Sequence, residues 1–520
     1  MKKKLIKAGA IVMIMAVLSS MLSMTSSAYI AFNSYNYNYY GEAVETPSGY
    51  SPEKVLYGAD FGIDELTNAA DIYVSPQKEI YILDYYGSDN EVRIHILDEN
   101  FNLITTLSTL QANGHDYKMN LAESVVVDQY GYIYVCDTGN RQVLKLDKDK
   151  SGKIIQTIGA PDSDLFSGDF KPSKLAIAKN MSLYVISRGC LDGIMEFDSN
   201  GKFLRYFGAP DVQLTLAQLM DLAWRKVYRA LLGKHVDSAF ITYVPTEFEN
   251  LVVDDYGFVY SVIAASGTEN TDQLVKMNFL GNNILDPTAK STQKVNSTLS
   301  RTYGDLVRRA TSGQGNIFKD VAVDEDGFIT MLDTNLRKVF EYDSEGNMTF
   351  VYGAKGSQQG LFESPCAIAK LGKKTLVLDS YYGSITVFDL TDYGETLHQG
   401  IVLYDQGLYT DAEIYWDAVL KSNANCELAH IGLGKVYYQY GRYEEALDHF
   451  KVANDRKNYQ DAFSLYRESV ISDHFNLVMT LLLLLILLLI LWRIFGKSIK
   501  AAIREKRQGG GDHDDSEGLE

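Results

Sequence analysis

The chain is poor in the residues that build metal centres and redox sites. Its 520 residues include only four cysteines and eight histidines. No two cysteines form a CxxC pair, which excludes a zinc ribbon and a thioredoxin-like redox motif. We interpret Cys136, Cys190, Cys366 and Cys426 as small buried residues rather than as a disulfide framework.

Positive charge is also scarce. The chain carries 49 Lys and Arg residues against 67 Asp and Glu, a formal net charge of -18. A protein that binds nucleic acid needs a basic stripe to neutralise phosphates. The composition therefore argues against a nucleic-acid partner.

Short alternating strands are abundant. Residues 123–161 hold four runs of β-branched and aromatic residues, separated by turns rich in Asp, Gly and Asn. A sheet of this size cannot bury its own faces, so it requires copies of itself. The strand–turn–strand core recurs at 72–84, 175–187, 251–263, 321–333 and 367–379. The six units predict a mainly β fold, a six-bladed β-propeller over residues 53–392.

The two ends of this region indicate how the ring closes. Residues 54–59 resemble the end of a blade, whereas the sixth unit stops at residue 390 without an outer strand. We expect the N-terminal strand to complete the sixth blade, because closure removes two free sheet edges.

Two insertions interrupt the repeats. Residues 211–240 carry apolar side chains at helical spacing, which predict either a helix that caps the propeller rim or a helix that docks a partner or a membrane surface. The insertion at 286–318 is rich in Ser, Thr and Asn, and we expect a long surface loop with a short helix near 303–310. The candidate docking residues are Leu216, Leu219, Met220, Trp224 and Val227.

After residue 391 the apolar period changes from that of a strand to that of a helix. Small and aromatic residues such as Gly400 and Trp416 recur 34 positions later as Gly434 and Phe450. This spacing predicts paired helices over 395–472, with 459–472 as the capping helix.

Two segments predict a membrane protein. Residues 1–28 have the charged start, short apolar run and small residues of an export signal, followed by a loose linker at 29–52. Residues 475–495 are long and apolar enough to span a bilayer, and basic residues follow them. The sequence thus predicts a single-pass protein of the cell membrane, with its bulk extracellular and the tail 496–520 in the cytoplasm.

The strand–turn–strand cores carry a family resemblance. The pattern of Asp128, Gly131 and Asp137 resembles the NHL repeat, and Asp324 with Gly327 begins a second clear copy. Residues 395–458 are similar to tetratricopeptide repeats, although Lys457 stands where that motif has proline. The combination with a membrane anchor resembles uncharacterised surface proteins of Gram-positive bacteria, some of which accompany transport systems.

The resemblance implies a search for enzymatic residues, since NHL-like propellers include metal-dependent lactonases, a zinc-dependent amidating lyase and lyases with a catalytic histidine. A zinc lyase needs several converging histidines. The predicted propeller contains only His95, His115 and His235, which we interpret as surface residues.

Calcium would instead require carboxylates and amides near the inner strands. The candidate metal ligands are Glu123, Asn250 and Asp320, with solvated loop residues as the alternative interpretation. The aspartates of the turns, such as Asp128 and Asp324, recur in several units, so we interpret them as turn residues rather than as an active site.

These observations favour a binding scaffold that presents one propeller face to a protein or carbohydrate ligand, with no cofactor apart from a Ca²⁺ ion as the alternative. The enzyme question stays open: a metal-assisted hydrolase or lyase at the channel mouth is one alternative. An accessory subunit of a membrane transport or cell-envelope complex is another.

Overall fold

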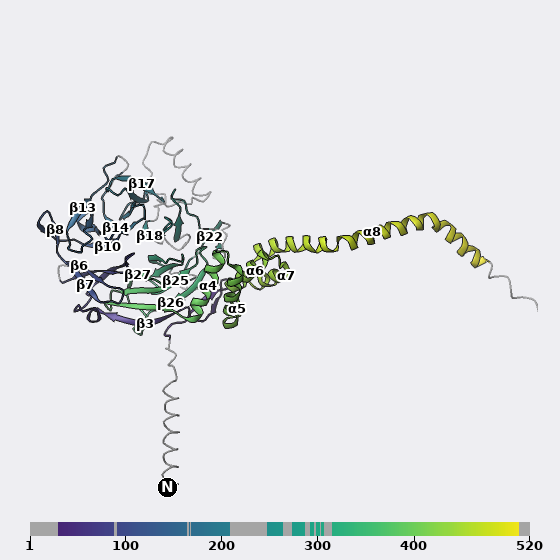
Figure 1. The fold of residues 1–520 in the computed structure, drawn as a ribbon, viewed down its shortest axis with the longest axis horizontal. Helices are drawn as coiled ribbons and strands as arrows, with labels where there is room; N and C mark the ends of the chain where they lie inside the picture. The colour runs from purple at the N-terminus through teal and green to yellow at the C-terminus, as the bar shows by residue number, and fades with distance from the viewer. Residues whose placement is uncertain are drawn as a thin grey trace, which may run out of the picture.

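The computed structural model describes residues 30–508 except 88–90, 164–165, 167, 209–246, 264–272, 286–291, 296–297, 302 and 306–314. Over these residues the chain forms a six-bladed β-propeller, a helical module packed against its side, and one long apolar helix that leads away from both (Figure 1). The predicted fold class is confirmed.

Each blade is an antiparallel sheet, and the first strands of neighbouring blades contact one another in a closed circle around the axis. Blade 1 contains β4 (Ala69–Val74), β5 (Ile80–Tyr86), β6 (Glu91–Leu97) and β7 (Leu103–Leu107). Blade 2 contains β10 (Ala122–Val127), β11 (Ile133–Asp137), β12 (Gln142–Leu146) and β13 (Ile154–Ile158). Blade 3 contains β14 (Pro172–Ile177), β15 (Leu183–Ser187), β16 (Ile194–Phe197) and β17 (Phe203–Phe207).

The remaining blades follow the same plan. In the described residues, blade 4 contains β18 (Phe248–Val253), β19 (Val259–Ile263) and β20 (Leu274–Met277). Blade 5 contains β23 (Phe318–Val323), β24 (Ile329–Asp333), β25 (Lys338–Tyr342) and β26 (Met348–Tyr352). Blade 6 contains β27 (Pro365–Leu371), β28 (Lys374–Asp379), β29 (Ser384–Leu390) and β3 (Tyr50–Tyr57).

The ring closes as predicted, because β3 pairs with β29 from Tyr57 opposite Ser384 to Tyr50 opposite Leu390. The turn interpretation is also confirmed. Asp128 Oδ1 accepts hydrogen bonds from the backbone N–H groups of Tyr130 and Tyr132, and Asp254 and Asp324 do the same in their blades. These aspartates stabilise hairpins.

A separate apolar cluster fills each of the six interfaces between neighbouring blades. The cluster between blades 5 and 6 is the exception in extent. It runs from Tyr352 and Phe388 through Leu397 of the first helix to Trp416 of the second. The propeller and the helical module therefore share one hydrophobic core on this side.

The segment predicted as a loose linker is ordered, so that prediction is wrong for residues 30–52. Strands β1 (Tyr35–Tyr37) and β2 (Ala43–Glu45) form a hairpin beside β26. Ser34 Oγ donates to the Val351 carbonyl at 2.7 Å, and Asn36 Nδ2 donates to the Met348 carbonyl at 2.9 Å. The Tyr and Asn side chains that read as low complexity make specific hydrogen bonds here.

The insertions are only partly described. The predicted docking residues Leu216, Leu219, Met220, Trp224 and Val227 lie outside the described residues. The second insertion, expected as a loop, contains a hairpin of β21 (Thr292–Val295) and β22 (Thr298–Arg301), and the short helix expected near 303–310 falls largely outside the described residues. A further small hairpin pairs β8 (Leu110–Ala112) with β9 (His115–Tyr117), and two 3-10 turns are η1 (Gly58–Phe61) and η2 (Thr138–Asn140).

The helical module packs small residues against aromatic ones, as the repeat spacing predicts. A Cβ added to Gly434 would come within 2.5 Å of the Phe450 ring, so only glycine lets the two helices approach this closely. Gly400 and Gly432 lie in the same way against Trp416. The helices are α4 (Asp392–Asp405), α5 (Tyr409–Ser422), α6 (Glu427–Gln439), α7 (Tyr443–Val452) and α8 (Arg456–Gln508).

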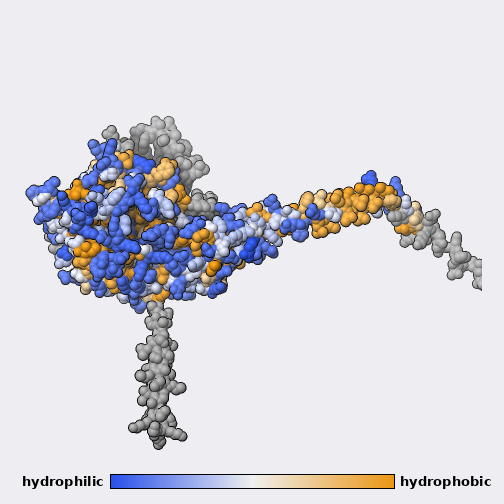
Figure 2. Space-filling view, viewed as in Figure 1, coloured by the Kyte–Doolittle hydropathy of each residue, from blue (hydrophilic) through white to orange (hydrophobic). Residues whose placement is uncertain are grey.

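Helix α8 joins two predicted elements. The capping helix at 459–472 continues without interruption into the apolar segment at 475–495. The part Arg456–Ser498 is long and apolar enough to cross a membrane. Figure 2 shows apolar side chains around the outer part of α8, where the helix has left the rest of the molecule.

Candidate functional site

Six equivalent positions of the inner strands form a ring around the propeller axis, which we call the axial ring. Each inner strand carries a β-bulge at the same point, which shifts the pairing by one residue. The residue after the bulge therefore occupies the same place in every blade. These residues are Asp71, Ser124, Lys174, Asn250, Asp320 and Ala367.

Side chains of the axial ring fasten one blade to another. Asp71 accepts a hydrogen bond from the backbone N–H of Val125 in the next blade at 3.1 Å, and from Lys174 Nζ in blade 3 at 2.7 Å. Asp320 accepts from the backbone N–H of Ile368 in blade 6 at 2.7 Å. Asn250 Nδ2 donates to Asp320, which links blade 4 to blade 5.

Burial and neighbouring charges shift the pKa values of two groups in the axial ring. Burial raises the pKa of Asp320 to about 7, with Lys174 opposing the rise and Asp71 adding to it. Burial alone would lower the pKa of Lys174, but the carboxylates of Asp71 and Asp320 outweigh it and raise that pKa above its ordinary value. Lys174 is therefore a protonated ammonium group placed between two carboxyl groups.

The structure brings together two of the three candidate metal ligands. Asn250 and Asp320 lie side by side in the axial ring, and their oxygens accept protein hydrogen bonds. Glu123 is the extra residue of the bulge in blade 2 and pairs with Arg188 Nη2 at 2.6 Å. Across the described ranges, no group of three or more His, Cys, Asp or Glu residues is placed to hold a metal ion. Calcium binding stays a prediction.

The interpretation of His95 as a surface residue is wrong. Its ring is buried in β6, where Nδ1 lies 2.9 Å from Thr106 Oγ1 and Nε2 has no partner in the part of the chain that the structure describes. Burial lowers its pKa to about 4, so the ring is neutral at physiological pH. The surface interpretation failed because both faces of a propeller blade pack against neighbouring blades, so neither face of its strands is in solvent. His115 lies exposed in β9, and His235 is outside the described residues.

Four residues of the axial ring, Asp71, Ser124, Asn250 and Asp320, line a cavity of about 810 Å³ at the end of the channel where the inner hairpins lie. All six inner strands contribute to its wall, together with Val402, Asp405 and Gln406 of α4. This volume falls in the range of pockets that hold small ligands. Eight carboxyl groups and four lysines line the cavity, along with Tyr73, Tyr256 and Phe258.

Hydrogen bonds tie the rim of this axial cavity together. Gln77 Nε2 donates to the Gln129 carbonyl at 3.0 Å, and Gln129 Nε2 donates to the Lys179 carbonyl at 3.2 Å. Lys179 Nζ then lies 3.0 Å from Asp255 Oδ1. Hairpins of blades 1 to 4 are thus connected in sequence, and Tyr256 projects from the last of them with 84% of its surface exposed.

A second polar cluster, the seam network, joins the propeller to α4. Its centre is Glu341 of β25, which is fully buried. Glu341 Oε1 lies 2.8 Å from both His398 Nε2 and Thr349 Oγ1, and Oε2 accepts from Tyr50 at 2.5 Å and from Lys370 at 3.3 Å. One carboxylate thus bonds to the ring-closing strand, to blades 5 and 6 and to the helical module.

Charge pairing compensates the burial of the seam network. Burial raises the pKa of Glu341, but His398 and Lys370 oppose it and hold the value at about 2, so the group is ionised. The His398 ring also stacks on Phe328 with 3.7 Å between centroids. Lys370 lines the axial cavity as well, so the seam network forms part of the cavity wall.

Sequence reasoning missed the seam network because its members do not recur together. Glu196 of blade 3 holds the place of Glu341, but it pairs with Arg205 at 2.6 Å instead. The sequence contained one indication of this network, a departure from the repeat pattern. The sixth unit has Lys370 at the strand position that Val127 and Val323 hold in the second and fifth, and a departure of this kind marks a position with its own role.

Comparisons with known proteins add to this picture. Residues 397–461 match the family model described as tetratricopeptide repeat. A probable peptidyl-alpha-hydroxyglycine alpha-amidating lyase of Caenorhabditis elegans is 31% identical over 93 residues, which are 17% of this chain and 26% of that protein. The matched part thus spans about a quarter of the relative's length.

Solved structures are similar over about two thirds of the chain, at low sequence identity. A protein of unknown function from Bacteroides thetaiotaomicron is 13% identical with a TM-score of 0.41, covering 68% of this chain and 80% of its own. Virginiamycin B lyase from Staphylococcus aureus is 9% identical with a TM-score of 0.39, covering 66% of this chain and 100% of its own.

Proposed function

We propose that this protein is a membrane-anchored binding scaffold whose axial cavity receives a ligand outside the cytoplasm. The observation that carries the proposal is the cavity itself. It has the volume of a ligand pocket, and every blade contributes to its wall. Its rim is held by inter-blade hydrogen bonds, so little ordering is required when a ligand binds.

The lining favours a ligand rich in hydroxyl or basic groups. Carboxylates outnumber lysines by eight to four, and they accept hydrogen bonds from sugar hydroxyls or from basic side chains. Tyr256 offers an exposed aromatic face at the rim. A carbohydrate or a segment of a protein fits this chemistry, and the two are distinguished by the test below.

The helical module and α8 give the scaffold its position. Residues 456–474 of α8 precede the apolar segment, and at 1.5 Å per residue they would hold the propeller about 30 Å from a bilayer. Arg493, Lys497, Lys500 and Arg504 follow the apolar run, which supports a cytoplasmic C-terminus. Protease added to intact cells should then degrade the propeller and spare the tail after Lys497. A protected propeller would overturn this topology.

Binding is tested with the full-length protein in lipid nanodiscs, offered panels of oligosaccharides and of acidic and basic peptides. We expect one class to bind, and Tyr256→Ala to weaken that binding by about tenfold, in line with the loss of one aromatic contact. Tyr130→Ala is the matched control, because Tyr130 holds the same turn position in blade 2 but does not line the cavity.

The alternatives give different results in the same experiment. Turnover of a bound compound, with a product detected by mass spectrometry, would favour the hydrolase or lyase. Equal effects of the two tyrosine substitutions would remove the axial cavity as the ligand site. Copurification of a transport or cell-envelope protein with the wild-type chain, undiminished in Tyr256→Ala, would favour the accessory subunit.

A further inference from the structure

Two histidines face each other in the helical module, away from the axial cavity and the seam network. His430 lies on α6 and His449 on α7, and their Nδ1 atoms are 2.9 Å apart. The centroids of the two rings are 5.1 Å apart, with an angle of 39° between the ring planes. Both side chains are half-buried, so a dissolved ion can reach the pair.

A backbone carbonyl fixes the tautomer of His430. The Nε2 atom of this ring lies 3.1 Å from the carbonyl oxygen of Ala424. A carbonyl oxygen only accepts hydrogen bonds, so Nε2 carries the proton and Nδ1 of the neutral ring has a lone pair. Metal-binding histidines are oriented in the same way, by a hydrogen bond from the second ring nitrogen to a carbonyl or carboxylate.

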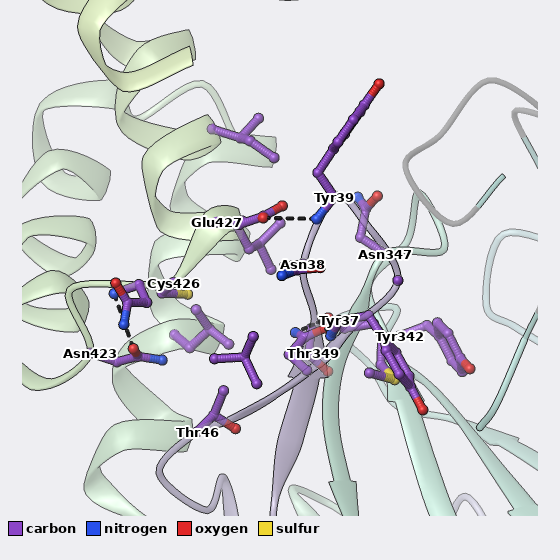
Figure 3. Close-up of a pocket in the computed structure, with 18 of the residues that line it drawn as sticks. Tyr37, Asn38, Tyr39, Thr46, Tyr342, Asn347, Thr349, Asn423, Cys426 and Glu427 are labelled. Carbon is purple, nitrogen blue, oxygen red and sulfur yellow. Dashed lines mark hydrogen bonds between the residues drawn. The ribbon is translucent and has the colours of Figure 1, made fainter. Parts of the chain in front are cut away.

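The loop that supplies this carbonyl is itself held by hydrogen bonds. Figure 3 shows two of its residues, Asn423 and Cys426, beside the start of α6. Asn423 Oδ1 accepts from the backbone N–H of Asn425 at 3.2 Å, and the Asn423 carbonyl accepts from the N–H of Cys426 at 3.1 Å. Asn423 Nδ2 donates to the Tyr393 hydroxyl of α4 at 3.3 Å. These contacts hold the Ala424 carbonyl in its place.

The second histidine can adopt the same tautomer at the expense of one hydrogen bond only. His449 Nδ1 donates to His430 Nδ1, because a single proton fits between two nitrogen atoms at 2.9 Å. His449 Nε2 makes no hydrogen bond within the described ranges. When the proton moves from Nδ1 to Nε2 of His449, both Nδ1 atoms present lone pairs to the space between the rings, and no proton is released.

The surroundings of the pair favour a cation. Burial lowers the pKa of His449, and His430 adds to this effect. The carboxylates of Asp417 on α5 and Asp448 on α7 oppose it. The ring is therefore neutral at physiological pH, which is the form that binds metal ions. The two carboxylates also place negative charge beside the pair, which attracts a divalent cation.

The separation of the two nitrogens selects the ion. Two nitrogens bound to a metal at about 2.0–2.1 Å and at right angles lie about 2.9 Å apart, whereas a tetrahedral angle requires about 3.3 Å. Right angles are typical of the square-planar sites of Cu²⁺ and Ni²⁺, and Cu²⁺ binds nitrogen ligands more tightly than Ni²⁺ or Zn²⁺. We propose that His430 and His449 form a Cu²⁺ site, with the Nδ1 atom of each ring as a ligand.

Such a site has two consequences for the helical module. The ion joins α6 to α7 and should stabilise the pair of helices, because it binds the folded arrangement only. Two protein ligands leave the remaining coordination positions of the ion to water or to a donor group of a bound molecule.

The test uses the full-length protein without an affinity tag, in lipid nanodiscs whose scaffold protein is also untagged. Cu²⁺ and Zn²⁺ are titrated in separate experiments against a weak chelator, with empty nanodiscs as the blank. We expect Cu²⁺ to bind at least about tenfold more tightly than Zn²⁺. Electron paramagnetic resonance of the bound Cu²⁺ should show coupling to two imidazole nitrogens. Equal affinity for the two ions, or a spectrum without two such nitrogens, would overturn the proposal.

A conservative variant locates the site. In His449→Gln the amide can still donate a hydrogen bond to His430 Nδ1, but it replaces the imidazole ligand. Cu²⁺ affinity should fall at least about tenfold in this variant. The control is His115→Gln, which should bind Cu²⁺ as the wild type does, because His115 lies exposed in β9, outside the helical module. Unchanged affinity in a folded His449→Gln would overturn the proposal.

Hydrogen–deuterium exchange keeps the test decisive if His449→Gln does not fold. In the wild-type protein, Cu²⁺ should slow amide exchange in α6 and α7 and leave β10 of blade 2 unchanged. Exchange in α6 and α7 that does not respond to Cu²⁺, or equal protection of β10, would contradict the assigned site.

Discussion

The axial ring and the seam network both bury charged groups, but they differ in how their hydrogen bonds are distributed over residues. In the axial ring each blade supplies one side chain, and Asp71 and Asp320 bond to the main chain of a neighbouring blade. In the seam network four side chains from distant segments converge on Glu341 alone. Distributed bonding tolerates variation from blade to blade, whereas a network centred on one carboxylate depends on that residue.

The largest expected effect follows from this difference. Glu341→Ala leaves Lys370 and His398 buried without their shared partner, and removal of one member of a buried pair costs about 3–5 kcal/mol. Urea unfolding of the variant should show the loss. The control is Glu345→Ala, since Glu345 lies 3.5 Å from Lys435 with its side chain largely exposed, and a change below about 1 kcal/mol is expected there. Equal losses in the two variants would break the comparison.

A smaller loss is expected in the axial ring. Asp71→Asn leaves the Lys174 ammonium facing a neutral amide, at a cost of about 1–3 kcal/mol by the same unfolding measurement. The cost is lower than for Glu341 because Lys174 also interacts with the Asp320 carboxyl group, which remains in the variant. A loss larger than that of Glu341→Ala would show that the axial ring, not the seam network, limits stability.

The pH dependence of stability separates two equivalent aspartates of the blades. Asp333 ends β24, and burial raises its pKa to about 7, with its Oδ2 unpartnered among the described residues. Because the folded pKa exceeds the unfolded one, this group lowers stability as the pH rises from about 4 through 7. Asp333→Asn should therefore raise the free energy of unfolding by about 1–3 kcal/mol at pH 8 and change it little at pH 4.

Asp137 occupies the equivalent place in blade 2 and is the control. Its carboxylate accepts from the backbone N–H of Asn120 at 2.7 Å and from Asn140 Nδ2 at 2.8 Å. Asp137→Asn should destabilise the protein at both pH values, because the amide has one acceptor oxygen where the carboxylate has two. A stabilising effect at pH 8 in both variants would show that the position, not the local bonding, sets the cost.

The smallest effect is expected at the rim of the axial cavity. Lys179 and Asp255 form an ion pair between blades 3 and 4, and both side chains are mostly exposed. Asp255→Asn should change the free energy of unfolding by less than about 0.5 kcal/mol. Thermal unfolding at low and high salt measures this change. A loss of stability above about 1 kcal/mol would mean that the rim contacts also hold the blades together.

The sequence predicted what local patterns encode. Alternating strands and Asp-x-x-Gly turns indicated six blades, and the likeness of residues 54–59 to a blade end indicated closure by β3. The seam network left no such pattern, since the hydrogen bond from Tyr50 to Glu341 joins residues 291 positions apart. The N-terminal hairpin was hidden for the same reason, because its strands are fixed by contacts with Asp305 and β26 rather than by their own periodicity.

The candidate site was only partly predictable. The sequence placed Asn250 and Asp320 at the channel, but it did not predict that they bond to each other and to backbone N–H groups. Which residues line the axial cavity depends on the bulge that each inner strand carries, and on the end of α4, which arrives from outside the repeats. Neither follows from the periodicity of one blade.

The most direct test of the binding scaffold is photo-crosslinking in intact cells. A benzophenone amino acid replaces Tyr256 at the rim of the axial cavity in one strain and Tyr130, its counterpart in blade 2, in the other. Irradiation should give a defined adduct, identified as glycan or peptide by mass spectrometry, at position 256 and not at position 130. Adducts of equal yield at both positions, or none at position 256, would contradict a ligand site in the axial cavity.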